Sequence, residues 1–449
     1  MGNMEGALKP DPVSTKQARI AELARKNPSM AFTSLNHHLD VELLRRAFEL
    51  TRKDGATGID GQTAADYERN LESNLEALLG RIKSGTYKAP PVRRAFIPKS
   101  DGSQRPLGIP TFEDKVAQRA IVLLLEPIYE RDFLPCSYGF RPGRSAHQAL
   151  QDLRTSIMTR GGRWVLDVDL RRYFDTIDHG HLRALLDRRV TDGVIRRMID
   201  KWLKAGVIEE GAIKRSDVGT PQGGVISPLL ANIVLHYVLD EWFARDVVPC
   251  MKARCALVRY CDDFVMVFED FLDCDRVQRV LGKRLAKYGL VLHAEKTKRV
   301  DFRFKRPNGE RHAATQATTF DFLGFTHLWG MTERGKHNVY QRTAKDRYAR
   351  ALHKVTDWCR RNRHRPVPEQ HARLSRMMKG HFAYFGITGN GRRIRWYAHQ
   401  VERVWFLSLR RRSRGERGGY RMFAALLQRH PLPPPRIVHR YAAASEPVT

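Results

Sequence analysis

The sequence predicts an α+β protein whose middle part carries antiparallel hairpins and whose two ends are helical. Short β-rich runs stand in pairs around polar turns near residues 90–110 and 256–268, which is the pattern of hairpins. Apolar residues recur at helical spacing from about residue 36, and stretches rich in Arg and Trp with helical character follow residue 330. The length of 449 residues and the hydrophobic content of 42% suffice for two or three folded domains.

Composition narrows the class of partner. The formal net charge is +30 and the isoelectric point is about 10.2, a balance that favours a polyanion, most simply a nucleic acid. None of the six cysteines forms a CxxC pair, so we expect no zinc ribbon or zinc-containing nuclease module, and we expect a reducing compartment. No run of about 18 apolar residues occurs, so we expect no membrane-spanning segment and no membrane partner. We expect a bacterial cytoplasmic protein, with association with the nucleoid as an alternative location.

The first part of the chain is expected to contain helices and one basic hairpin. Residues 36–85 have helical periodicity, interrupted by a glycine-rich break at 55–61 that we interpret as a loop. Residues 90–110 form a hairpin with a turn at 100–102. A helix is expected over about 113–129, and its apolar stretch indicates that it is buried.

Carboxylates give the strongest chemical signal. Asp262 and Asp263 fall at the tip of the hairpin predicted at 256–268, where two adjacent negative charges repel unless a cation lies between them. Carboxylate oxygens are the ligands that Mg²⁺ prefers, and Mg²⁺ held in this way usually also binds substrate phosphates. A turn with two solvated Asp residues is the alternative interpretation.

A second acidic strand supplies further candidates. Nucleotidyl transfer requires two metal ions about 3.5–4 Å apart, and we expect a third carboxylate because two Asp residues on one turn cannot hold both. Residues 164–170 alternate between apolar and acidic side chains, so they predict a strand with Asp167 and Asp169 on one face. Asp169 stands 93 residues before Asp262 (262 − 169).

These segments resemble the motifs of reverse transcriptases, in the same order. Residues 169–179 resemble the first palm motif of that family, residues 221–232 its PQGxxxSP motif, and residues 260–263 its YxDD motif. More narrowly, the chain is similar to the reverse transcriptase/maturases encoded by bacterial group II introns. The segments that carry this narrower resemblance are 58–61, 97–99, 105–111, 137–145, 320–325 and 379–385. Cys261 departs from the Ala that is usual in the YxDD box, and its thiol could be sensitive to oxidation.

The resemblance, which covers about residues 35 to 440, implies a right-hand polymerase. Fingers and palm with an antiparallel sheet would be followed by an α-helical thumb continuous with a maturase domain. The implied division is a helical N-terminal extension (1–85), fingers and palm (86–330), and an RNA-binding thumb and maturase region (331–449). The implied reaction is the RNA-templated addition of dNTPs to a primer 3′-end, with two Mg²⁺ ions as cofactors and release of pyrophosphate.

The resemblance also implies roles for individual residues. Asp169, Asp262 and Asp263 would be catalytic and would hold the two Mg²⁺ ions. Asp167 lies outside the motif, so we interpret it as a structural carboxylate that could still tune the site. The residues expected to contact the incoming nucleotide or the template near it are Lys99, Arg105, Phe174, Gln222 and Lys296.

The expected nucleotide contacts differ in chemistry. Lys99 and Arg105 would grip the triphosphate, where cations stabilise the charge on departing pyrophosphate. Phe174 would press on the sugar and disfavour a ribose 2′-hydroxyl, with core packing as its alternative role. Lys296 would donate a proton to pyrophosphate, and an ordinary surface position is its alternative.

Residues 391–440 are expected to bind RNA. They contain 13 Arg, no Lys and two Glu, a net charge of 13 − 2 = +11. Arg makes bidentate phosphate contacts and stacks on bases, and aromatic residues are interleaved with it, although core packing is favoured for any single one of them. The residues expected to contact RNA are Arg410, Arg411, Arg412 and Arg414.

The implied partners are group II intron RNA, an RNA template with a DNA primer, dNTPs and a DNA target. One alternative is a domesticated reverse transcriptase without its own intron, acting in repair or phage defence; flanking intron RNA would separate the two. Another is a splicing cofactor with a dead polymerase site, but a binding module does not need three carboxylates facing a polyanion. We expect no Cys-containing HNH nuclease, so intron insertion would proceed without second-strand cleavage by the protein's own domain.

Overall fold

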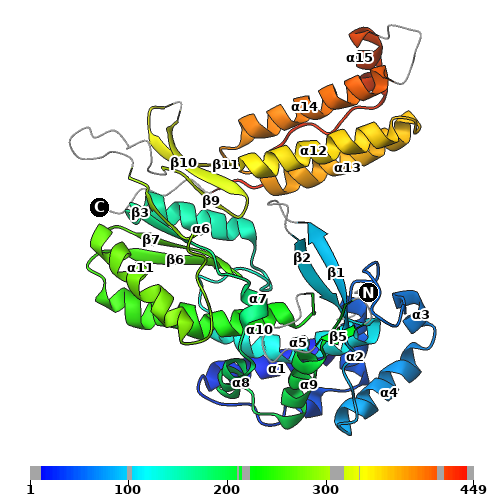
Figure 1. Cartoon of the computed structure of the whole chain (residues 1–449), viewed down its shortest axis with the longest axis vertical. Coiled ribbons are helices and arrows are strands. Elements are labelled where there is room, and N and C mark those ends of the chain that lie inside the picture. Colours follow the sequence, from blue (N-terminus) through cyan, green and yellow to red (C-terminus); the bar gives the residue numbers. More distant parts are fainter. Residues whose placement is uncertain are drawn as a thin grey trace, which may run out of the picture.

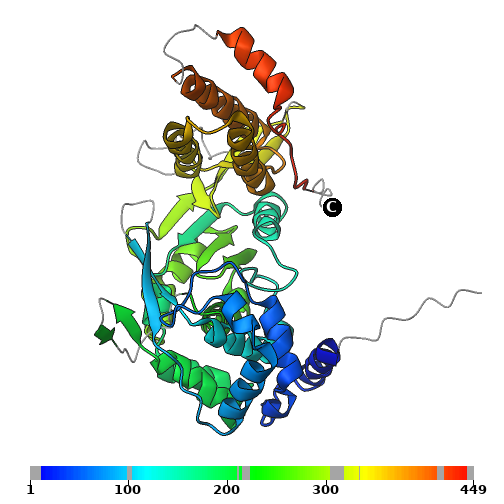
Figure 2. The same cartoon turned by 90° about the vertical axis from the view of Figure 1, so that its right-hand side faces the viewer.

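The computed structural model describes residues 12–98, 104–209, 212–214, 223–303, 318–332, 334–411 and 419–441. Helices from the first part of the chain lie at one end of the long axis, a sheet with helices on both faces lies in the middle, and a helical bundle lies at the other end (Figures 1 and 2). The predicted α+β class with antiparallel sheets is confirmed.

The N-terminal end is built around one long buried helix, α5 (Phe112–Asp132). The other elements of this end are α1 (Pro12–Lys26), η1 (Leu35–His38), α2 (Val41–Leu50), α3 (Ala64–Glu68) and α4 (Leu71–Lys83). α1 and α2 pack against α5, whose apolar side chains are buried along its length. The buried helix and the loop at 55–61 are therefore confirmed.

The basic hairpin also forms as predicted. β1 (Val92–Pro98) pairs antiparallel with β2 (Gln104–Ile109). β4 (Val207–Glu209) and β5 (Ala212–Lys214) extend the sheet to the order β2–β1–β4–β5, in which β1 and β4 run parallel. Gly223 approaches this sheet so closely that a Cβ on it would lie 2.6 Å from the carbonyl oxygen of Gly108, and its φ of +114° also favours glycine.

The central sheet has the strand order β6–β7–β3–β8 and is antiparallel throughout. Its strands are β6 (Cys255–Tyr260), β7 (Asp263–Phe268), β3 (Trp164–Val168) and β8 (Lys298–Asp301). Val165 and its neighbours on one face pack with α6 (Ala146–Met158), and Leu166 and its neighbours on the other face pack with α11 (Phe271–Ala286). Because both faces are covered, β7 is apolar at every position after Asp263.

A long helix begins at Ser227 in the central part. α10 (Ser227–Leu235) continues into two π-helical stretches, η2 (His236–Asp240) and η3 (Phe243–Val247), and ends in the 3-10 turn η4 (Val248–Cys250). π-Helical turns are rare and are frequently found at functional sites. The remaining helices of the central part are α7 (Tyr173–Thr176), α8 (His179–Asp187) and α9 (Gly193–Lys204).

A three-stranded sheet that the sequence did not predict joins the central part to the C-terminal helices (Figure 1). Its strands are β9 (Phe320–Phe322), β10 (Phe325–Met331) and β11 (His337–Thr343). The expectation of helices immediately after residue 330 is therefore wrong for residues 337–343, and helix begins only at Lys345. The predicted division at residue 330 falls within β10. The strand pattern of β11 was not recognised because this strand is rich in polar residues and buries only alternate ones.

The C-terminal helices form a bundle with its own core. They are α12 (Lys345–Asn362), α13 (Val367–Phe385), α14 (Gly391–Arg410) and α15 (Tyr420–Arg429). The segment after α15 returns toward α13, where His439 bridges to Ile387. Among the described helices, none is both long enough and apolar enough to cross a membrane.

Candidate active site

The tip of the β6–β7 hairpin carries two adjacent carboxylates, as predicted. Tyr260 pairs with Asp263, which leaves Cys261 and Asp262 as a two-residue loop. Two-residue hairpin loops need a positive φ, and Cys261 adopts a φ of 59° although it is not glycine. The turn therefore holds a conformation that is costly for a residue with a side chain.

Asp169 lies beside this tip. Val168 pairs with Phe264, so Asp169 and Asp263, the next residues of the two strands, adjoin each other at the end of the sheet. On the other side, His293 donates its backbone N–H to the carbonyl of Asp169 at 2.8 Å. The sheet register thus brings together two carboxylates that are 94 residues apart (263 − 169).

A cleft of about 600 Å³ opens beside these carboxylates. Asp167, Asp169 and Asp263 line one wall, together with Lys296. The turn between β9 and β10, the start of α12 and the end of α13 also line this cleft. Asp262 is half-buried at the tip and is not among the residues that line this cleft.

Lys296 belongs to the site rather than to an unrelated surface. Its Nζ lies 3.2 Å from Oδ2 of Asp169, and its side chain is 56% exposed. The segment that carries it is held against the end of β3, because Leu292 bridges to Leu170 and His293 bonds to Asp169. The ammonium group of Lys296 therefore lies beside Asp169, the first residue of the motif at 169–179.

The carboxylates on this face influence one another. The pKa of Asp167 is raised to about 7, chiefly by burial and also by the negative charges of Asp263 and Asp169, whereas Lys298 opposes the shift. Asp167 therefore faces the same space as the two carboxylates at the strand ends, as its position two residues before Asp169 predicted. This repulsion is the electrostatic condition in which a bound cation is stabilising.

The donor set fits a hard cation. Carboxylate oxygens at the strand ends are suitable ligands for Mg²⁺, which commonly uses one or two carboxylates plus substrate phosphates. Among the residues that the structure describes, no group of three His, Cys, Asp or Glu side chains is assembled closely enough to hold a metal ion unaided.

Cys261 is buried beneath the tip, with 3% of its surface exposed. Burial raises the pKa of its thiol, and the neighbouring Asp262 carboxylate raises it further. Because the thiolate is the reactive form, this environment disfavours the oxidation that the sequence suggested.

Phe174 follows Asp169 by five residues and is partly buried. It follows Tyr173 in the short helix α7, and the two rings meet edge to face with centroids 5.5 Å apart. Tyr173 is fully buried and donates its hydroxyl to the carbonyl of Ala231 at 2.6 Å. Phe174 also contacts the main core, so its packing role and its proposed contact with a sugar are compatible.

Several predicted contacts cannot be placed. Lys99, Gln222, Arg412 and Arg414 lie outside the described residues, and Arg105 is described only as a backbone position in β2, opposite Ile97. Arg410 and Arg411 are exposed at the C-terminal end of α14. Their predicted contact with RNA stays a prediction.

Some residues of the cleft were not predicted as site residues. Leu323 and Gly324, both with positive φ, form the turn between β9 and β10 that faces the carboxylates, and Tyr384 donates its hydroxyl to the carbonyl of Leu323 at 2.9 Å. The predicted motifs at 320–325 and 379–385 contain these residues without indicating their role. Asp346 and Arg347 also line the cleft and had no signal in the sequence.

Strained backbone occurs at the hairpin tip and in the lining of the cleft. In the parts of the chain that the structure describes, four residues other than glycine have a positive φ. They are Phe140, Arg172, Cys261 and Leu323. Arg172 follows Asp169 closely in sequence, Leu323 lines the cleft, and the ring of Phe140 lies 6.4 Å from that of Tyr260. Such strain is typical of functional sites.

Comparison with known proteins agrees with this geometry. Residues 97–327, just over half of the chain, match the family model described as reverse transcriptase (RNA-dependent DNA polymerase). The chain is 35% identical over 287 residues to Protein YkfC of Escherichia coli, an alignment that covers 57% of this chain and 75% of that protein.

The names of two further relatives refer to introns. Group II intron-encoded protein LtrA of Lactococcus lactis is 39% identical over 223 residues, which are 49% of this chain and 36% of LtrA. An uncharacterized 91 kDa protein in the cob intron of Schizosaccharomyces pombe is 41% identical over 168 residues, 37% of this chain and 20% of that protein. The chain thus matches only about a third of the length of LtrA, and less of the yeast protein.

Proposed function

We propose, from the premise that this chain belongs to the reverse transcriptase (RNA-dependent DNA polymerase) family, that the cleft beside the hairpin tip is its polymerase site. The observation that carries the proposal is the register of the central sheet, which sets Asp169 beside Asp263 at the mouth of the cleft. The predicted family and enzyme class are confirmed by the same similarity.

In this proposal Asp169, Asp262 and Asp263 would hold two Mg²⁺ ions. When bound, such ions lower the pKa of the attacking 3′-hydroxyl and neutralise charge on the leaving group. The turn and the strand ends fix the backbone of these three residues, so their carboxylates would be held in place to bind the ions. The cleft accommodates the primer end and the incoming dNTP.

The other predicted residues would act on the substrate directly. Lys296, beside Asp169, would hold a proton that leaves with pyrophosphate. Phe174 would limit space at the sugar 2′ position. Lys99 and Arg105 at the hairpin of β1 and β2 would bind the triphosphate, and Gln222 would contact the nucleotide or the template.

We further propose that the chain binds group II intron RNA and assists its splicing and mobility at a DNA target. Similarity to LtrA, whose name states that it is encoded by a group II intron, supports this role. Residues 391–440 add a net charge of 13 − 2 = +11, and Arg410 and Arg411 are exposed on this part. RNA affinity should fall with salt at a slope of about −0.7 for each phosphate contacted on a single strand. The C-terminal bundle would then serve as thumb and maturase region.

Primer extension on an RNA template tests the polymerase site. Asp262→Ala and Asp263→Asn should each abolish extension of a DNA primer and leave RNA binding intact. Asp54→Ala is a matched control, because Asp54 is exposed and pairs only with the nearby Arg52 among the contacts described for it. Persistent extension by Asp262→Ala would show that the site assignment is wrong.

Sequencing the RNA recovered with the protein at low salt tests the second proposal. A single structured RNA surrounding the reading frame of the protein would support a maturase. A diverse mixture from a protein that still extends primers would favour a domesticated polymerase instead.

A further inference from the structure

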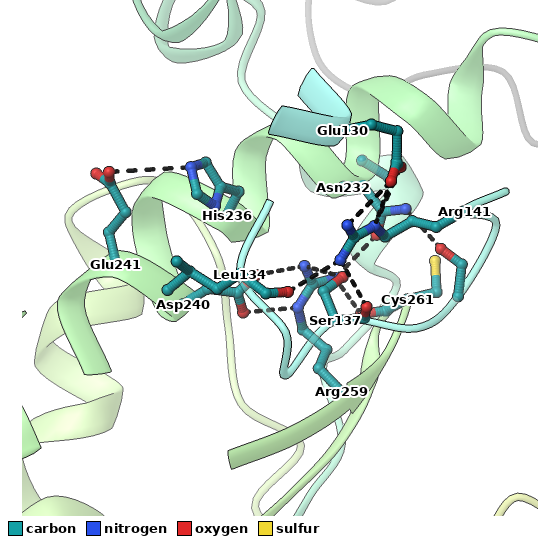
Figure 3. A network of polar contacts seen from close by, with 12 residues as sticks. Glu130, Leu134, Ser137, Arg141, Asn232, His236, Asp240, Glu241, Arg259 and Cys261 are labelled. Atoms are coloured by element: carbon teal, nitrogen blue, oxygen red, sulfur yellow. Dashed lines mark hydrogen bonds and ion pairs between the residues drawn. The ribbon is translucent and has the colours of Figure 1, made fainter. Parts of the chain in front are cut away.

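Arg259, the residue before Tyr260, is completely buried under the hairpin tip. A guanidinium carries five N–H donors, and here each of the five has an acceptor (Figure 3). Asp240 accepts from Nε at 2.8 Å and from Nη2 at 2.5 Å. Asn232 and Cys261 accept from Nη1, and Ser137 accepts from Nη2.

One of these bonds reaches the tip itself. Arg259 Nη1 donates to the backbone carbonyl of Cys261 at 3.0 Å. Cys261 is the residue with the strained positive φ, and its carbonyl belongs to the peptide bond that leads into Asp262. The guanidinium therefore fixes the orientation of the peptide that carries the first carboxylate of the pair.

The guanidinium is itself anchored to two separate segments, the loop before α6 and the continuous helix formed by α10 and η2. Asn232 comes from α10 and also donates to the carbonyl of Gly139 at 2.7 Å. Ser137 comes from the loop before α6, and its own carbonyl accepts a bond from Arg141 at 2.8 Å. Asp240 ends the π-helical stretch η2. The guanidinium thus links the hairpin tip to the loop before α6 and to the helix that carries Asn232 and Asp240.

Stability alone is a weak reason for such a group. A fully buried ion pair loses so much solvation that apolar residues of similar volume often serve equally well or better. The Arg259–Asp240 pair has no solvent exposure at either side chain. What an apolar pair could not supply is a donor to the Cys261 carbonyl.

We infer that Arg259 is a positioning residue for nucleotidyl transfer, with Asp240 as its anchor. It acts through the Cys261 carbonyl to hold Asp262 and Asp263 at a fixed place relative to Asp169. This inference rests on the proposed catalytic role of those three carboxylates. Arg259 itself is fully buried, so it acts on the carboxylates and not on substrate or metal.

The test compares two buried arginines. Arg259→Lys keeps the positive charge but cannot satisfy five acceptors. Arg189→Lys is the matched control, because Arg189 is also buried (3% exposed), pairs with Asp132 and donates to backbone carbonyls such as that of Met30. Both variants should lose thermal stability.

Three measurements separate positioning from stability. The first is kcat for primer extension, which Arg259→Lys should lower about 10²-fold, the usual effect of a misplacement near 1 Å. The second is Mn²⁺ binding by electron paramagnetic resonance, with template, incoming dNTP and a primer ending in a dideoxynucleotide, so that no bond forms. Binding should weaken at least about tenfold in Arg259→Lys and stay unchanged in Arg189→Lys. The third is RNA affinity, which should not change in either.

A second variant covers the case in which Arg259→Lys does not fold. Arg259→Met combined with Asp240→Leu removes the charges together, and we expect it to fold with reduced kcat and weakened Mn²⁺ binding. Wild-type kcat and Mn²⁺ binding in either folded Arg259 variant would overturn the inference. A wild-type protein that extends no primer would instead overturn the proposed function.

Discussion

Substitution of Gly139 by alanine is expected to displace the hairpin tip by about 1 Å. A methyl group on Gly139 would lie 2.5 Å from the backbone nitrogen of Cys261 and 3.0 Å from the carbonyl carbon of Tyr260. Both are backbone atoms, which cannot turn aside as a flexible side chain can. Ordinary contact begins at 3.4 Å, so Gly139→Ala requires a separation of about 3.4 − 2.5 = 0.9 Å between the loop and the tip.

The expected cost follows from this displacement. A misplacement of about 1 Å in a catalytic group commonly costs on the order of 10²-fold in rate, which equals about 2.7 kcal/mol on the activation barrier. If the loop takes up part of the strain instead, the folded state should lose about 1–3 kcal/mol of stability, as in other overpacked sites. We therefore expect Gly139→Ala to lower kcat for primer extension about 100-fold, with unchanged RNA affinity.

The assay is primer extension at saturating RNA template and dNTP, accompanied by thermal unfolding. Gly143→Ala is the matched control, because Gly143 is in the same loop and has a φ of +68°, but a methyl group there meets nothing within 4 Å. It should cost about 1–2 kcal/mol of stability through its backbone alone and leave kcat unchanged. Wild-type kcat in Gly139→Ala would refute the argument that the tip depends on this contact.

Three further predictions concern single side chains. Burial raises the pKa of Asp114 to about 6. The carboxyl group therefore keeps its proton to a higher pH in the folded state than in the unfolded chain. The contribution of Asp114 to stability is complete below about pH 4 and is lost as the pH rises through 6. Asp114→Asn should remove this part of the pH dependence of unfolding, up to about 3 kcal/mol, and an unchanged pH profile would count against it. Phe174→Ala should raise the ratio of ribonucleotide to deoxyribonucleotide incorporation, and an unaltered ratio would leave Phe174 a packing residue. Lys296→Gln should slow extension roughly 10²-fold, because it removes both the ammonium group beside Asp169 and a proton donor to pyrophosphate; extension at the wild-type rate would mean that Lys296 takes no part in the reaction.

The sequence predicts individual helices and strands better than the tertiary contacts between them. The hairpin at 256–268 is legible because two apolar runs flank an acidic turn, and the structure confirms it. That Asp169 adjoins Asp263 depends on strand register, which no local pattern specifies when both faces of the sheet are apolar. The sheet of β9, β10 and β11 was missed because β11 is polar and only one of its faces is buried.

The network around Arg259 was also beyond sequence reasoning. One arginine among 79 basic residues gives no sign that it is fully buried. Its acceptors come from positions 137, 232, 240 and 261, which converge only in the folded chain. A residue of this kind is found by its burial and its satisfied donors rather than by its neighbours in sequence.

The location of the carboxylates follows from how the central sheet is covered. Because helices bury both of its faces, an ionised group within the sheet loses solvation, and only the strand ends reach water. Asp167 shows the cost: it stands one pleat inward from Asp169, and its pKa is raised to about 7. Asp169 and Asp263 stand at the ends of their strands and line the cleft. A sheet with two apolar faces thus leaves its end as the place for acidic chemistry, and a rigid support such as Arg259 is needed because a strand end is otherwise the least constrained part of a hairpin.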